Sequence, residues 1–491
     1  MPSYILPIAI ALPVLGGALV PVLPFQKKRS MHIYVESVVV LTSILVFFIL
    51  FNPPGETMNL IHFFGDLSIS FQLDGLGSVF TAMIAFLWPL ATLYAFEYME
   101  HEGKEKSFFM FYTMTYGVTL GISMAANVLT MYGFYEMLTL VTFPLVMHSG
   151  SREAILASRK YLYYSIGGAA FAFIGMIFVI TYGLTPDFTY GGVLDLAAIG
   201  SRENILLLVY VFAFMGFGVK AAIFPLSSWL PQAGVAPTPV TALLHAVAVV
   251  KAGAFATMRL TYYMFGPDFL KGTWAQYVVM GLVVFTIVYG CSMAVKETHF
   301  KRRLAYSTVS NLSYILFGVV LMSPLGLVGG LSHMVFHAFM KILSFLCAGA
   351  VIVQSGKTFV HQLNGLGKKM PQIFTLFTLA SLALMGVPGL CGFVSKWNLT
   401  KAAVDSGNVL AYVGIAALLI SALLTGIYMM TIVIRAFVLT PEEDDKEFGN
   451  IKDPGWRMLI PLYIFAAGCV LFGLYSGPIV DYFTQIANGL L

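Results

Sequence analysis

The chain has 491 residues, of which 59% are hydrophobic and only 10% are charged, and its mean hydropathy is +0.86. No soluble core needs this much apolar sequence, so the composition excludes a soluble multidomain protein and indicates many membrane spans. The net charge of +4 is small, and no basic face with interleaved aromatic residues points to nucleic acid.

Fourteen apolar stretches are long enough to cross a bilayer as helices, so the sequence predicts an all-α polytopic membrane protein. The first stretch lacks a basic n-region and is followed by KKR, which is typical of an uncleaved span rather than a signal peptide. The predicted spans cover residues 3–25, 32–51, 72–97, 107–126, 128–149, 160–182, 204–226, 238–265, 274–295, 304–322, 325–353, 372–400, 409–437 and 457–477.

The basic residues between these spans are distributed unevenly. Loops after odd-numbered spans hold 19 Lys and Arg residues, whereas loops after even-numbered spans hold only Arg202, Lys271 and Lys401. Because basic loops stay in the cytoplasm, the pattern predicts cytoplasmic odd-numbered loops and both termini outside. The expected location is a prokaryotic cell membrane. The acidic stretch 441–456 is interpreted as a solvated cytoplasmic connector, with docking of a partner subunit as the alternative.

Two charged residues near span ends have structural interpretations. Asp74 opens the third span in FQLDGLGSVF and is interpreted as a helix cap or a structural residue at the interface. Arg259 is expected to snorkel from the end of the eighth span.

Glu136 is interpreted as the only carboxylate in the middle of a predicted span, roughly nine residues into the fifth helix. A lone carboxylate there would stay protonated, whereas a carboxylate beside an ammonium group can ionise, and Lys220 is its natural partner. A static ion pair between two helices is the structural alternative, although buried pairs stabilise poorly compared with apolar packing.

Four lysines lie deep in apolar sequence, namely Lys220, Lys251, Lys341 and Lys396. Each ammonium group costs at least ~2.5–3.5 kcal/mol in hydrocarbon. Prolines interrupt three of the predicted spans, which are numbered here as helices in chain order. Helix 7 is broken near Pro225, helix 8 ahead of Lys251, and helix 12 around Pro388. Such breaks survive at membrane depth only where protein or water satisfies the freed backbone. Helices 7 and 12 lie five apart and therefore run in opposite directions, a pattern that points to a transport site at the midplane.

Histidines accompany these lysines. His245 precedes Lys251 by six residues and either relays protons near neutral pH or simply packs in the core. In the eleventh span His333, His337 and Lys341 recur at intervals of four, which places them on one helix face. A hydrated proton relay is the preferred interpretation over chance packing. A metal pair is disfavoured because the HExxH glutamate and a third ligand are missing.

The cysteines are scattered singly through apolar sequence and form no CxxC pair; they are Cys291, Cys347, Cys391 and Cys469. We therefore expect buried, inert thiols, and neither a metal site nor a cofactor in this chain. If the function is linked to redox chemistry, the electrons travel in another subunit.

Several motifs together carry a specific resemblance. They are FYEMLTLVTFPLV, KAAIFPLSSWLPQAGVAPTPVTALLHAVAVVKAG, KRRLAYSTVSNLSYILFGV, SHMVFHAFMKILSFLCAGAVI and GVPGLCGFVSKWNL. Over residues 72–440 the chain resembles the antiporter-like subunits of the respiratory complex I superfamily, which includes Mrp cation/proton antiporters and energy-converting membrane-bound hydrogenases. The resemblance implies fourteen helices with two inverted repeats, helices 4–8 and 9–13. The corresponding division of the chain is 1–106, 107–265, 266–440 and 441–491.

The resemblance also implies roles for the buried residues. Glu136 and Lys220 would form the coupled pair, and Lys251 would be the central proton carrier. The histidines and lysine of helix 11 would lie on a hydrated axis, with Lys396 at the far gate. One branch of the family has Glu at that last position, so the lysine argues against that branch.

The function predicted from these features is that of a proton-translocating subunit in a multi-subunit ion-pumping membrane complex. A histidine on helix 8 and GFVSKW resemble hydrogenase-type or Mrp-type subunits, and the absence of a long lateral helix weakens assignment to the distal complex I subunit. The expected partners are other membrane subunits, including further antiporter-like subunits, and a peripheral redox arm if the complex is redox-driven. Sodium is kept as an alternative to protons as the transported ion. The alternatives are an NADH-quinone oxidoreductase membrane-arm subunit, a stand-alone secondary transporter and an inert scaffold.

Overall fold

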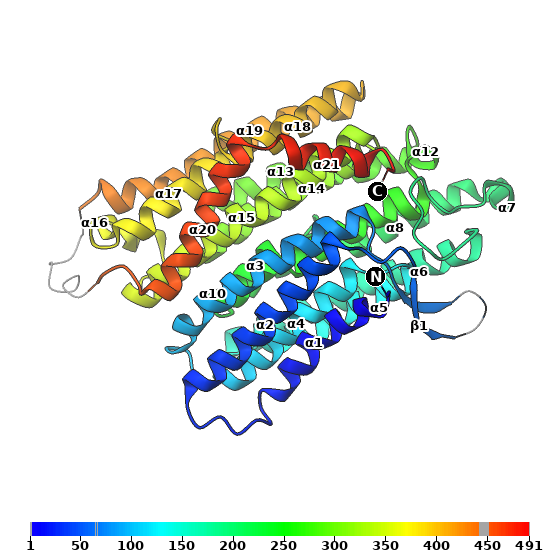
Figure 1. The fold of residues 1–491 in the computed structure, drawn as a ribbon. Coiled ribbons are helices and arrows are strands. Elements are labelled where there is room, and N and C mark those ends of the chain that lie inside the picture. Colours follow the sequence, from blue (N-terminus) through cyan, green and yellow to red (C-terminus); the bar gives the residue numbers. More distant parts are fainter. Residues whose placement is uncertain (1, 64, 66, 441–450, 491) are drawn as a thin grey trace.

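The computed structural model describes residues 2–63, 65, 67–440 and 451–490. Within this part the chain is a bundle of long helices that lie side by side, as Figure 1 shows. Ten of the described helices are long and apolar enough to cross a membrane. The predicted all-α polytopic fold is thus confirmed. The count of fourteen spans and the division into two inverted repeats stay predictions.

The N-terminal part contains α1 (Ile5–Leu19), α2 (Lys28–Phe51) and α3 (Gly75–Met99). A short antiparallel hairpin, β1 (Met58–His62) and β2 (Ser68–Phe71), separates α2 from α3 and was not predicted. The Asp74 side chain accepts a hydrogen bond from the Gly77 backbone at 2.9 Å and caps α3. The predicted capping role of Asp74 is confirmed.

The next four long helices belong to the first half of the bundle. They are α4 (Glu105–Ser123), α5 (Val128–Val146), α6 (Arg152–Tyr182) and α8 (Glu203–Gly218). Asn127 and Ser151 cap α5 and α6 with their side-chain oxygens. Regular helix ends at Gly218, just before Lys220, so the predicted break in this span is present. The chain resumes as α9 (Trp229–Gln232) and α10 (Thr238–Ala246).

A second break separates α10 from α11 (Val249–Met258), which continues as a π-helical turn over Arg259–Phe265. The second half then contains α13 (Trp274–Lys296), α14 (Phe300–Val320) and α15 (Pro324–Ser355). In the α10–α11 segment, every residue of an 18-residue stretch is buried. In α15, 94% of the residues of such a stretch are buried. These two elements form the core of the bundle, and they carry most of the predicted site residues.

The predicted break in the twelfth span separates α17 (Pro371–Met385) from α18 (Cys391–Asp405). Two further long helices follow, α19 (Val409–Phe437) and α20 (Trp456–Leu474). A final helix, α21 (Gly477–Ala487), lies across the bundle and was not predicted (Figure 1). Short helical turns complete the described elements: α7 (Leu196–Ile199), η1 (Gly200–Arg202), η2 (Ala233–Val235), α12 (Pro267–Leu270), η4 (Val360–Leu363) and α16 (Leu366–Lys369).

Two isolated bridges each join loops that follow spans of the same parity. Asn127 and Asp187, which follow the predicted fourth and sixth spans, form one antiparallel bridge, and His299 and Phe359, which follow the predicted ninth and eleventh spans, form another. Each bridge brings two such loops together, as spans that alternate in direction require. Both chain termini lie toward the end that carries the β hairpin (Figure 1). Which end faces the cytoplasm stays a prediction.

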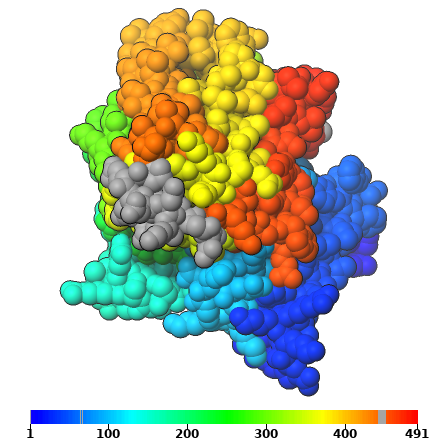
Figure 2. Space-filling model, turned by 90° about the vertical axis from the view of Figure 1, so that its left-hand side faces the viewer, coloured from blue at the N-terminus to red at the C-terminus, as the bar shows by residue number. Residues whose placement is uncertain are grey.

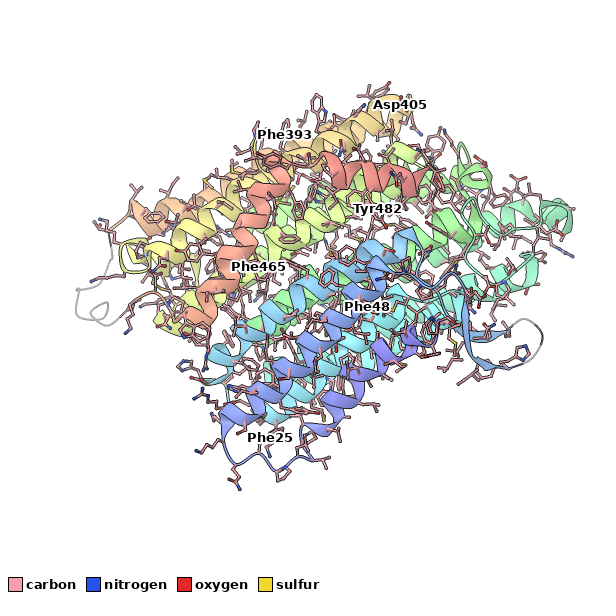
Figure 3. The ribbon with its side chains drawn as sticks, viewed as in Figure 1. Phe25, Phe48, Phe393, Asp405, Phe465 and Tyr482 are labelled. Atoms are coloured by element: carbon pink, nitrogen blue, oxygen red, sulfur yellow. The ribbon has the colours of Figure 1, made fainter. Side chains whose placement is uncertain are left out.

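Many large apolar side chains are exposed on the outer surface, as a lipid-facing surface requires. Phe48 on α2 is 52% exposed and Phe393 on α18 is 36% exposed, and both are labelled among the side chains of Figure 3. In an end-on view, the first and last thirds of the chain occupy opposite sides of the molecule (Figure 2). The part of the acidic stretch that covers residues 441–450 lies outside the described residues.

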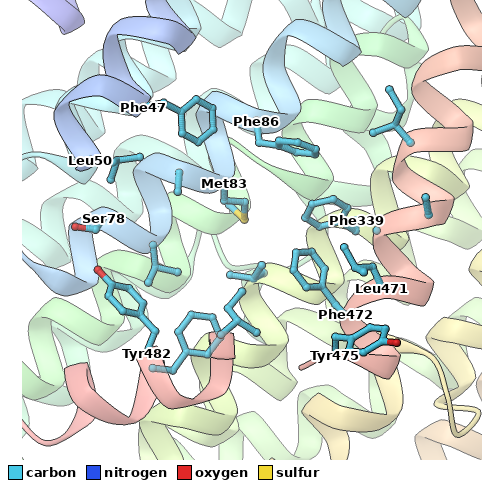
Figure 4. A pocket seen from close by; sticks show the side chains of 18 of the residues that line it. Phe47, Leu50, Ser78, Met83, Phe86, Phe339, Leu471, Phe472, Tyr475 and Tyr482 are labelled. Carbon is cyan, nitrogen blue, oxygen red and sulfur yellow. The ribbon is translucent and has the colours of Figure 1, made fainter. Parts of the chain in front are cut away.

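A groove of about 1060 Å³ opens between the α2–α3 pair and the α20–α21 pair. Figure 4 shows its apolar lining, with Phe47 and Met83 on one side and Phe472 and Tyr482 on the other. None of the described residues that line it is an Asp, Glu, Lys, Arg or His. The groove is therefore separate from the ionisable residues described next.

Candidate functional site

The centre of the candidate site is a contact between α11 and α15. The Nζ atom of Lys251 lies 2.6 Å from Nδ1 of His337, and both side chains are fully buried. An ammonium group has no acceptor, so His337 accepts this hydrogen bond when Lys251 is charged, and the roles can reverse when Lys251 is neutral. A short, reversible contact of this kind can pass a proton between the two residues.

The contact continues along α15 toward α18. The ring of His337 stacks on the ring of His333 with centroids 5.6 Å apart. Nδ1 of His333 lies 2.9 Å from Oγ of Ser395, the residue that precedes Lys396. The Nε2 atoms of both histidines are buried and have no hydrogen-bond partner. Unpaired buried nitrogens of this kind are where ordered water completes a network.

Lys396 is held by the broken twelfth span. Its Nζ atom donates to the carbonyl oxygens of Leu384 and Met385 at 2.7 and 2.9 Å. These carbonyls belong to the last turn of α17, where backbone acceptors are free and the helix dipole is negative. The break thus supplies the counter-charge that makes a buried lysine tolerable at this position.

Lys341 and His245 lie outside this line of hydrogen bonds and ring contacts. Lys341 Nζ donates to the Leu304 carbonyl oxygen at 3.1 Å and to Ser307 Oγ at 2.7 Å, so its side chain points toward α14. The ring of His245 packs on Phe345 with centroids 4.7 Å apart, and neither ring nitrogen has a partner. Lys341 therefore shares a helix with the two histidines of α15 but not their hydrogen-bonded line.

The predicted ion pair between Glu136 and Lys220 is not formed in this structure. Lys220 instead donates to the backbone oxygen of Tyr135, and its Nζ lies 3.6 Å from the centroid of the Tyr135 ring. Oε1 of Glu136 is buried and has no hydrogen-bond partner. The two side chains are close enough for their charges to interact without forming an ion pair.

A glycine brings Lys220 close to the helix of Lys251. A Cβ atom added at Gly253 of α11 would lie 2.5 Å from the Ala221 nitrogen and 2.8 Å from the Lys220 carbonyl carbon. No larger residue fits there without moving backbone. Gly253 therefore sets the approach of the Lys220 segment to the central lysine.

Arg259 does not snorkel, and that expectation is wrong. Its side chain is 1% exposed and donates to both carboxylate oxygens of Asp74 at 2.5 and 2.6 Å. The aromatic rings of Phe188 and Tyr263 flank the guanidinium group, with centroids 4.7 and 4.5 Å away. The sequence alone did not indicate this pairing, because the two residues are 185 positions apart in the chain.

Glu36 was also overlooked. It is the ninth residue of α2, just as Glu136 is the ninth residue of α5, and its Oε2 is buried without a partner. Glu36 is therefore another carboxylate within a long helix, but it lies in the first half of α2, whereas Glu136 lies at the middle of α5. Four extra residues at the start of α2 place Glu36 deeper in its helix than the predicted start at residue 32 implied.

No group of three or more His, Cys, Asp or Glu residues is placed to hold a metal ion in the part of the chain that the structure describes. The four cysteines are free and buried, as predicted. What the site does contain is a set of buried side chains that can donate or accept protons.

The family comparison matches most of the chain. Residues 125–425 match the family described as "NADH:quinone oxidoreductase/Mrp antiporter, TM". Residues 61–109 match the family described as "NADH-Ubiquinone oxidoreductase (complex I), chain 5 N-terminus". The first match alone covers more than half of the chain and all of the site residues that the sequence predicted, from Glu136 to Lys396.

Individual relatives agree with the family match. The chain is 29% identical over 431 residues to NADH-quinone oxidoreductase subunit N of Desulforudis audaxviator, covering 85% of this chain and 84% of the relative. It is 30% identical over 492 residues to F(420)H(2) dehydrogenase subunit L of Methanosarcina mazei, covering 93% and 70%. Its fold is similar to a chain in the Mrp complex from Dietzia sp. DQ12-45-1b, with a TM-score of 0.84, 21% identity and coverage of 99% and 97%.

Proposed function

This chain belongs to the NADH:quinone oxidoreductase/Mrp antiporter family, and from that premise we propose that it carries protons through the membrane part of a multi-subunit ion-pumping complex. The observation that carries the proposal is the 2.6 Å contact between Lys251 and His337 in the most deeply buried part of the bundle. A charged residue at such depth is costly and needs a functional reason.

The proposed path runs from Lys251 through His337 and His333 to Ser395 and Lys396. Each of the first three is linked to the next by a direct hydrogen bond or a ring contact. Between Ser395 and Lys396, and at the two unpaired Nε2 atoms, the path needs water. Protons arrive at Lys396, where the carbonyl groups of α17 stabilise the charge until it is released.

Glu136 controls this path through Lys220. When the Glu136 carboxylate pairs with Lys220, the lysine charge is neutralised locally. When the pair is separated, we propose that the Lys220 charge acts on Lys251, whose helix packs against the Lys220 segment at Gly253. Like charges repel strongly where the dielectric is low. The separation therefore drives a proton from Lys251 to His337, and renewed pairing allows Lys251 to reload.

We propose that other membrane subunits, further antiporter-like subunits among them, hold this chain in its complex and that a redox reaction or an ion gradient elsewhere drives the cycle. A hydrogenase-type or Mrp-type complex is the first candidate. A membrane arm of an NADH-quinone oxidoreductase is the second, and the name of the Desulforudis audaxviator relative supports it. We propose no cofactor within this chain. Sodium prefers oxygen ligands, which the Lys–His line does not offer, so protons are the proposed cargo.

Replacing Glu136 with Gln tests the coupling. The variant keeps the size of the side chain but cannot neutralise Lys220, so we expect proton transport by the assembled complex to fall by roughly tenfold or more. Transport is measured as acidification of inverted membrane vesicles, with and without sodium. Glu153→Gln, at an exposed position in the first turn of α6, is the matched control and should transport normally. Full activity of Glu136→Gln would show that the proposed coupling is wrong.

A further inference from the structure

The last turn of α17 is shaped to offer two carbonyl oxygens to Lys396. Gly386, with a φ of 92°, ends the helix and donates its backbone N–H to carbonyls one turn back. The carbonyls of Leu384 and Met385 are thereby left for Nζ of Lys396, which donates to them at 2.7 and 2.9 Å. The placement of α17 therefore decides whether these two acceptors reach the lysine.

The first turn of the same helix is held by a residue 80 positions further along the chain. The carboxylate of Asp453 accepts two backbone hydrogen bonds there, Oδ2 from Gln372 at 3.2 Å and Oδ1 from Ile373 at 3.1 Å. Met370, at the N-cap position, makes no side-chain cap hydrogen bond, and Pro371 has no N–H to satisfy. A negative carboxylate also suits the positive end of the helix dipole. Asp453 thus does the work of a missing N-cap residue.

The segment that carries this carboxylate is itself fixed to α3. The backbone N–H of Gly455 donates to Oε1 of Glu97 at 2.6 Å. Nη1 of Arg457 lies 3.3 Å from Oε1 of Glu100. Both acidic residues belong to the end of α3, where Glu100 is the C-cap residue. The segment therefore joins the end of α3 to the start of α17.

The other end of α3 is joined to the helix of Lys251. Asp74 caps α3 and accepts both hydrogen bonds of Arg259, the residue that follows α11. Helix α3 is thus tied at its start to the helix that carries Lys251, and at its end to the segment that caps α17. Direct contacts connect the helices at the two ends of the proposed proton path along a route that uses none of the path residues.

We propose that Asp453 is a positioning residue for Lys396. Its carboxylate fixes the start of α17 to residues 453–457, so that the carbonyl groups at the other end of the helix stay within reach of the lysine. The 15 residues of α17 span about 22 Å. A helix of this length moves as a unit, so a displacement of its first turn is passed on to its last. This role rests on the proposed function, which places Lys396 on the proton path.

Replacing Asp453 with Ala tests this role. The substitution removes both acceptors, and we expect proton transport to fall by roughly tenfold, because small displacements far from the reacting groups have effects of this size. The measurement is acidification of inverted vesicles at matched amounts of assembled complex. Asp453 is partly exposed, so its removal leaves no buried charge and the complex should still assemble.

Two further variants make the result specific. Asp453→Asn keeps an acceptor oxygen in the same place and should transport within about threefold of the unchanged complex. Glu100→Gln, which weakens only the exposed pair with Arg457, is the matched control and should transport normally. Equal transport by the Ala and Asn variants, whether normal or slow, would overturn the proposal.

Electron cryomicroscopy of the Asp453→Ala complex gives a measurement that needs no transport. We expect the distances from Lys396 Nζ to the Leu384 and Met385 oxygens to exceed about 3.5 Å, while the contact between Lys251 and His337 is kept. Unchanged hydrogen bonds at Lys396 would overturn the positioning role. Lys396→Met separates this failure from that of the proposed function, because normal transport by that variant would remove Lys396 from the path wherever α17 lies.

Discussion

Replacing Lys251 with Arg is expected to stop proton transport while the complex still assembles. Arginine keeps the positive charge next to His337 but cannot give up its proton, since its guanidinium group stays charged at any accessible pH. If Lys251 hands a proton to His337, transport should fall by roughly 100-fold or more, the usual size of the loss of a proton-transferring group. The measurement is the initial rate of vesicle acidification at matched amounts of assembled complex.

Two further substitutions make the result specific. Lys251→Met removes both charge and proton and should be equally inactive. Lys271→Met, at an exposed loop position, should leave transport unchanged. If Lys251 served only to fill the core with a positive charge, the Arg variant would transport while the Met variant would not. That outcome would refute the proposed role of Lys251 as a carrier.

Breaking the Asp74–Arg259 pair is expected to give the largest loss of stability. Asp74→Asn would leave the guanidinium group, which is 1% exposed, without its counter-charge. Removing one partner of a buried pair costs about 3–5 kcal/mol. The Asp74 side chain is 24% exposed, so we expect a value near the lower end of that range. The measurement is equilibrium unfolding of the purified chain or complex in mixed detergent micelles.

A double variant separates charge from packing. Asp74→Asn together with Arg259→Met removes both charges and should recover much of the lost stability, because no unpaired charge remains in the core. Phe188 and Tyr263 would then pack against an apolar side chain. If the double variant were as unstable as the sum of the single variants, the pair would contribute through packing and not through its charges.

The pair also matters for the position of the site. Arg259 begins the π-helical turn that follows α11, and Asp74 caps α3. Their contact fixes the end of the helix that carries Lys251 to the start of a neighbouring span. We therefore expect Asp74→Asn to reduce the thermal stability of the complex before it changes the chemistry at Lys251.

Much of the fold could be predicted because membrane insertion depends on local sequence. A span must be apolar over about 20 residues, and each lysine placed in such a span costs free energy wherever its helix packs. The breaks at Lys220 and near Pro388 follow from proline and glycine, which act on their own turn of helix. The β hairpin and α21 were missed because short elements carry no comparable signal.

The candidate residues could be chosen by the same local rule, because an ionisable residue stands out in an apolar span. Their hydrogen-bond partners could not be predicted in this way. Sequence spacing places His333 and His337 on one face of a helix, yet only packing decides that His337 meets Lys251 while Lys341 turns toward Ser307. The chain by itself therefore determined that this is a helical membrane protein with protonatable groups at its centre. The tertiary structure decided which of these groups touch, because a hydrogen bond depends on the meeting of side chains from helices far apart in sequence.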